Sequence, residues 1–170
     1  MNICDFAMEM EDNGCEYYKS LASAATLPGL KTIFTRLAED ERKHFEIFRD
    51  LKAGKQIQPI PETGTLETAQ NVFSLLPRGA EGVEDISGVL EAYAHAMKLE
   101  SNSFRFYEEA AANENVAEVK ALLLQIAAEE HKHFNVLENI YHFVNAPNQH
   151  LEWAEFSNLG EFRQFGRDGD

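Results

Sequence analysis

An internal repeat with an offset of 89 positions is the feature that most constrains how this chain can fold. No gap is needed to superpose the two halves. In one block, the identical pairs are Ala7/Ala96, Met8/Met97, Glu11/Glu100, Asn13/Asn102, Tyr18/Tyr107 and Ala22/Ala111. In a second block, they are Ala38/Ala127, Glu41/Glu130, Lys43/Lys132, His44/His133 and Phe45/Phe134. The repeat predicts two halves of the same fold, and its Ala and Phe positions are typical of a packed core.

Apolar residues recur at helical spacing in four long stretches, which we place at 2–24, 29–53, 84–112 and 115–145. Turn-forming residues separate them. The first and third connections are short, which favours antiparallel hairpins, whereas a connection of about thirty residues between the second and third helices suits a crossover. The sequence therefore predicts an all-α, antiparallel four-helix bundle with a long crossover.

Two short helices are expected outside the four long ones. Residues 65–76 open with Thr-Leu-Glu-Thr, which offers a capping residue and good helix formers inside the crossover. The tail contains a further short helical segment within 148–165 and ends in polar residues. We divide the chain into the bundle, residues 1–147, and a C-terminal tail with a short helix, residues 148–170.

Composition limits the classes of function. The chain has 170 residues and is 44% hydrophobic, which suffices for one domain with a core. Its net charge of −14, without a basic stripe, argues against nucleic-acid and anionic-membrane partners. The two cysteines, Cys4 and Cys15, are too few for a disulfide framework or a tetrathiolate metal site. Without a secretory signal or a membrane-length apolar run, the expected location is cytoplasmic.

Two Glu-x-x-His motifs occur at the repeat offset, and each follows a glutamate by 30 residues that itself precedes a tyrosine by seven. Glutamate and histidine three positions apart share one helix face. The glutamate and the motif of each half are equidistant from the hairpin loop, so they lie at the same height in the bundle. The candidate metal ligands are Glu11, Glu41, His44, Glu100, Glu130 and His133.

The neighbours of these residues are apolar, which places the carboxylates in the core. Four converging carboxylates would be costly there without cations, and two divalent metal ions would neutralise them. Imidazole with carboxylate suits iron or manganese, and also zinc. Tyr18 and Tyr107 either donate hydrogen bonds to the ligand carboxylates or fill core space.

These motifs resemble the rubrerythrin-type branch of the ferritin-like superfamily over residues 2–145. The resemblance implies a ferritin-like bundle with a di-iron carboxylate centre that reduces hydrogen peroxide or dioxygen. Typical rubrerythrins also carry a rubredoxin domain, which Cys4 and Cys15 cannot supply. They carry an extra glutamate one turn from the third-helix ligand as well, where this chain has Met97 and Ser103.

Several other polar residues are assigned no role in the site. We expect Asp40 and Glu129, which adjoin the ligand glutamates, to be solvated charges on the outer face. His131 points away from the metal face, and the remaining unmatched histidines, His95, His142 and His150, are structural or surface residues. The repeated pair Asn13 and Asn102 has no assigned chemistry.

Three functions fit this pattern. The first is a di-iron oxidoreductase that reduces peroxide or dioxygen with electrons from a rubredoxin-like protein or a flavoprotein. The second is ferrous-iron oxidation and handling, and the third is a bundle with a non-catalytic structural metal. The expected cofactor is two iron ions, with manganese or zinc as alternatives, and the expected assembly is a homodimer in which helical hairpins are exchanged or not.

Overall fold

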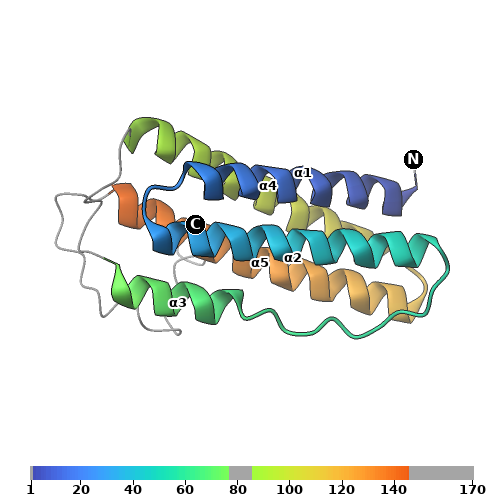
Figure 1. The fold of residues 1–170 in the computed structure, drawn as a ribbon. Helices are drawn as coiled ribbons and strands as arrows, with labels where there is room; N and C mark the ends of the chain where they lie inside the picture. Colours follow the sequence, from blue (N-terminus) through green and yellow to red (C-terminus); the bar gives the residue numbers. More distant parts are fainter. Residues whose placement is uncertain (1, 77–85, 146–170) are drawn as a thin grey trace.

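The computed structural model describes residues 2–76 and 86–145 and contains helices joined by turns and extended connections, with no strand among these residues. The helices are α1 (Ile3–Ala24), α2 (Pro28–Lys52), α3 (Thr65–Leu75), α4 (Ile86–Asn113) and α5 (Ala117–Asn145). As Figure 1 shows, α1 with α2 and α4 with α5 form two hairpins that lie side by side. This arrangement confirms the predicted all-α bundle. The expected tail helix lies outside the described residues.

Local sequence signals mark where the helices of the two hairpins begin. The side chain of Asn2 accepts a hydrogen bond from the backbone N–H of Cys4 (3.0 Å) and thereby caps α1. Pro28 lies at the first position of α2, where its missing N–H costs nothing. Glu114 accepts hydrogen bonds from the N–H groups of the next two residues and shapes the turn before α5. Both hairpin turns are therefore only a few residues long.

The crossover runs back along the bundle to α3, which packs against α2 and α5 (Figure 1). Ile60 is buried in this connection, and its carbonyl accepts a hydrogen bond from Gln125 of α5 (3.0 Å). The predicted short helix is present, but its expected capping residue is wrong. Gly64 occupies the cap, while the buried Thr65 donates its hydroxyl hydrogen bond to Asp40 of α2. The threonine that was expected to cap α3 therefore joins α3 to α2 instead.

Two apolar clusters form the core. The first surrounds Phe34, Phe73 and Phe143 and includes residues from all five helices. The second surrounds Phe48 and Ile126 and includes Ala7 of α1 and Ala111 of α4. The buried charged groups of α1, α2, α4 and α5 belong to neither cluster. None of the described helices is long and apolar enough to span a lipid bilayer.

Candidate metal centre

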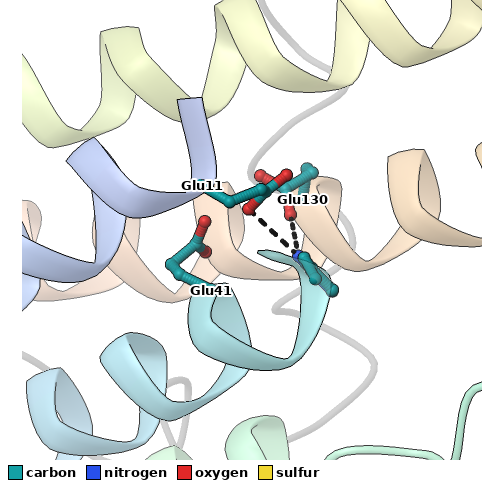
Figure 2. A group of neighbouring side chains, drawn as sticks. Glu11, Glu41 and Glu130 are labelled. Atoms are coloured by element: carbon teal, nitrogen blue, oxygen red, sulfur yellow. Dashed lines mark ion pairs between the residues drawn. The ribbon is translucent and has the colours of Figure 1, made fainter. Parts of the chain in front are cut away.

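The structure brings together all six side chains that the sequence singled out. Glu11 comes from α1, Glu41 and His44 from α2, Glu100 from α4, and Glu130 and His133 from α5. All six have 3% or less of their surface exposed. Figure 2 shows Glu11, Glu41 and Glu130 pointing toward one another from three different helices. The three-residue spacing within α2 and α5 places each histidine on the same face as its glutamate.

The donor atoms fall into two groups, in each of which they lie within 4.8 Å of one another. One group is Glu11, Glu41, His44 and Glu130, and the other is Glu41, Glu100, Glu130 and His133. Glu41 and Glu130 belong to both groups. The 89-position repeat relates each residue of one group to a residue of the other. The site therefore has approximate two-fold symmetry in its composition. Two adjacent metal positions that share two carboxylates match this pattern.

Distances across the site follow the same symmetry. Nδ1 of His44 lies 2.9 Å from Glu130 Oε1 and 3.4 Å from Glu11 Oε2. Nδ1 of His133 lies 3.0 Å from Glu41 Oε1 and 3.7 Å from Glu100 Oε1. Each histidine therefore faces a glutamate of the other hairpin, which ties the two halves together at this level of the bundle.

The inner atoms of the site make no hydrogen bond of acceptable geometry within the described part of the chain. They include Nδ1 of both histidines, both carboxylate oxygens of Glu130, and one oxygen each of Glu11, Glu41 and Glu100. Buried polar atoms are almost always paired, since leaving one unpaired costs about 1–3 kcal/mol. Apart from one oxygen of Glu138, all the buried side-chain atoms without a hydrogen bond among the described residues belong to the six candidate ligands. Their chemistry, four carboxylates and two imidazoles, therefore fits two divalent cations.

Asp40 and Glu129 correct the sequence interpretation, because both are buried rather than solvated (1% and 4% exposed). Glu129 Oε2 lies 3.0 Å from Nε2 of His44, and Asp40 Oδ2 lies 3.3 Å from Nε2 of His133. Each carboxylate thus contacts the outer nitrogen of the histidine in the other hairpin. Residues 40 and 129 are themselves related by the repeat offset, and this signal could have identified them.

The two buried tyrosines also connect the hairpins. Tyr18 of α1 donates a hydrogen bond to Glu100 of α4, and Tyr107 of α4 donates one to Glu11 of α1. Each bond leaves the second carboxylate oxygen of its glutamate without a hydrogen bond. The tyrosines therefore fix the orientation of two candidate ligands while leaving one oxygen of each for a cation.

Charges in the metal-free site compete for protons. Burial, followed by repulsion from the neighbouring glutamates, raises the pKa of Glu41 and Glu130 well above the usual value of 4.5. Burial disfavours the charged form of His44 and His133, but the surrounding carboxylates outweigh it and raise both pKa values well above 6.5. Burial likewise opposes ionisation of Glu11, yet the charge of His44 holds its pKa below the usual range. Protons thus replace cations when no metal is bound.

The unmatched histidines of the described part of the chain make their contacts outside this site. The exposed His131 stacks on Phe104 with ring centroids 3.7 Å apart and lies 3.0 Å from Glu108. His95 is exposed and packs edge-on against Tyr17. His142 is also exposed, and His150 lies outside the described residues. For the three described histidines, the structure agrees with a structural or surface role.

A family model described as rubrerythrin matches residues 2–141, which includes all six candidate ligands. No curated protein and no solved structure shows significant similarity to the chain.

Proposed function

This chain belongs to the rubrerythrin family, and from that premise we propose that it is a di-iron carboxylate oxidoreductase. It reduces hydrogen peroxide or dioxygen with electrons from a separate donor protein. The observation that carries this proposal is the pair of buried ligand groups that share Glu41 and Glu130. Adjacent metal ions sharing ligands suit chemistry at two neighbouring oxygen atoms.

The six candidate ligands fall into three pairs with different roles. Glu41 and Glu130, which belong to both groups, would help to hold both metal ions, Glu11 and Glu100 would each help to hold one, and the two histidines would each supply one neutral nitrogen. Two iron ions bound by this anionic set would supply the electrons for reduction of an O–O bond. The family suggests iron, and the ligand types are also compatible with manganese or zinc.

The residues around the ligands hold them in position. Glu129 and Asp40 accept hydrogen bonds from the outer nitrogens of His44 and His133, which orients the inner nitrogens toward the metal positions. Tyr18 and Tyr107 donate hydrogen bonds to Glu100 and Glu11 and thereby orient these two carboxylates. The two apolar clusters exclude water from both ends of the site, which strengthens electrostatic interactions inside it.

We propose that the electrons come from another redox centre. Cys4 and Cys15, the two cysteines of this sequence, are buried and free, and four thiolates would be needed to hold a rubredoxin iron. We therefore propose a rubredoxin-like protein or a flavoprotein as the donor. We further propose that the protein is a homodimer.

Ferrous-iron oxidation with storage or transfer is the second candidate function. The same six residues would carry it, because the carboxylates favour ferric iron whichever way that iron later leaves. A redox-silent structural metal is the third candidate.

Anaerobic loading with ferrous iron, followed by hydrogen peroxide in one sample and air in another, separates these functions. The proposed oxidoreductase shows an optical change with either oxidant and repeated turnover once a reductant protein is added. Oxidation without turnover, with iron retained or passed on, identifies the ferroxidase. The absence of any optical change with both oxidants identifies the structural metal and rejects the proposal. His44→Ala is expected to slow oxidation sharply while helix content is preserved.

A further inference from the structure

A cavity of about 220 Å³ lies between α1 and α4 and reaches the candidate metal centre. Its lining includes Tyr18, Glu41 and Glu100. Glu41 Oε1 and Glu100 Oε2 are among the buried oxygens that make no hydrogen bond. Because Glu41 belongs to both ligand groups, a molecule at this end of the cavity meets a carboxylate that the two metal positions share.

Six of the ten residues that line this cavity form pairs at equivalent positions of the two halves. Each pair is related by the 89-position offset: Met10 and Leu99, Asn13 and Asn102, and Gly14 and Ser103. The cavity therefore follows the approximate two-fold relation between α1 and α4. This gives the repeated asparagines, for which the sequence suggested no chemistry, a place in the structure.

Small residues keep the cavity open where it approaches the ligands. A Cβ atom added at Gly14 would lie 3.1 Å from Glu41 Oε2, closer than ordinary van der Waals contact. Ser103, at the equivalent position of α4, carries only a hydroxymethyl group. Both residues lie one helical turn from a candidate ligand, on the same helix face as that ligand. A larger side chain at either position would occupy the space in front of the site.

The outer part of the cavity combines amide and apolar groups. Asn13 and Asn102 are exposed and offer hydrogen-bond donors and acceptors, while Met10 and Leu99 are half-buried. This lining contains no cationic side chain, and its carboxylates lie at the metal centre. It favours a small neutral molecule over a charged one.

Two larger cavities on the described part of the chain do not reach the site. One, of about 270 Å³, lies under the crossover near Ile57 and Leu122. The other, of about 750 Å³, lies along α1 and α2 near Cys15. Neither is lined by any of the six candidate ligands. The cavity between α1 and α4 differs from both in having Glu41 and Glu100 in its lining.

We propose that the cavity between α1 and α4 is the route by which a small neutral oxidant reaches the metal centre, and that Gly14 and Ser103 set its size limit. The volume is below the roughly 300–1,000 Å³ of pockets for drug-sized ligands. It is several times the roughly 30 Å³ that a water molecule occupies in the liquid. Hydrogen peroxide and dioxygen fit this range. Their identity as substrates rests on the proposed function, whereas the route does not.

The test measures how fast nitric oxide, a small neutral probe, binds to the anaerobic, ferrous-loaded protein in stopped flow. Ser103→Leu narrows the cavity, and Ser20→Leu, at an exposed position of α1 outside it, is the matched control. Metal stoichiometry is measured in each variant. We expect Ser103→Leu to bind two metal ions but to bind nitric oxide at least about tenfold more slowly. Ser20→Leu is expected to match the unsubstituted protein.

Leu99→Phe, a conservative apolar change in the same wall, gives a second test if Ser103→Leu does not fold. An unchanged nitric oxide rate in either fully metal-loaded variant overturns the route, as does a failure of nitric oxide to bind the unsubstituted ferrous protein. The proposed function fails separately, if neither peroxide nor dioxygen oxidises the ferrous protein. In that case the nitric oxide rates still decide whether this cavity is the route.

Discussion

At the scale of single residues, each half of the site supplies a carboxylate that contacts a histidine of the other half. Glu129 of α5 supports His44 of α2, and Asp40 of α2 supports His133 of α5. A carboxylate that accepts the outer N–H of a ligand histidine fixes the ring and increases its basicity. The metal affinity of each half of the site should therefore depend on an acidic residue of the other half.

The first prediction concerns these two carboxylates. Glu129→Gln and Asp40→Asn should each lower metal affinity by about 10–100-fold, because the outer partner of a histidine loses its charge. Titration with Co²⁺ or Fe²⁺ under anaerobic conditions measures the effect. Glu39→Gln, an exposed neighbour of Asp40, is the control and should bind metal normally. Equal affinity in all three variants would mean that the buried carboxylates do not support the histidines.

At the scale of whole helices, α3 joins the site to the crossover. Thr65 is buried at the start of α3, and its hydroxyl donates a hydrogen bond to Asp40, which also contacts Lys43 (3.1 Å). The crossover therefore helps to hold the carboxylate that supports His133. Of the two supporting carboxylates, Asp40 accepts this hydrogen bond from α3, and Glu129 has no equivalent bond among the described residues. The two halves of the site therefore differ at this point.

The second prediction tests this connection. Thr65→Val keeps the shape of the side chain but removes the hydroxyl donor, and it should lower the free energy of unfolding by about 0.5–1.5 kcal/mol. Urea denaturation followed by circular dichroism measures the change. Thr68→Val, one turn along α3 and half-buried, is the control and should have a smaller effect. A larger loss for Thr68→Val than for Thr65→Val would contradict the role given to this hydrogen bond.

The long helices and the six inner residues could be predicted because both follow from periodicity. Helical spacing placed α1, α2, α4 and α5 within one or two residues of their observed ends, and the repeat aligned the inner groups at one height. The spacing does not predict the burial of Asp40 or Glu129, because a residue next to a ligand on a helix is expected to face solvent. In the bundle, α2 is covered on more than one side, so the adjacent position is buried too. The spacing of residues within one helix does not show which of its sides other helices will cover.

At the scale of the molecule, a layer of buried charge lies between two apolar clusters and must be neutralised for the bundle to be stable. Metal ions or protons can do this. In the metal-free protein, Glu41, Glu130, His44 and His133 all have raised pKa values, so the folded state binds protons more tightly than the unfolded chain does. The unfolded chain releases these protons near the usual pKa values of 4.5 and 6.5. Stability from these groups must therefore fall as the pH rises above those values.

The third prediction follows from this decrease in stability with rising pH. The melting temperature of the chelated protein should drop by several degrees between about pH 5.5 and about pH 8.5, because the unfolded chain releases protons there that the folded site binds more tightly. Glu11 and Asp40, whose pKa values are lowered, have the opposite dependence, but their contributions are lost only as the pH falls below their usual values of 4.5 and 3.8. Bound metal replaces the protons, and its affinity increases as the donors deprotonate. The gap in melting temperature between the metal-loaded and chelated forms should therefore widen with pH.

Calorimetry of both forms at the two pH values measures this gap, and Glu130→Gln is the informative variant. It removes one buried charge, so the chelated variant should melt with a shallower pH dependence than the chelated parent protein. Glu118→Gln, at an exposed position near the start of α5, should leave that dependence unchanged. A chelated protein that became more stable with rising pH would show that the buried glutamates ionise without cost. The requirement for metal or protons between the two apolar clusters would then fail.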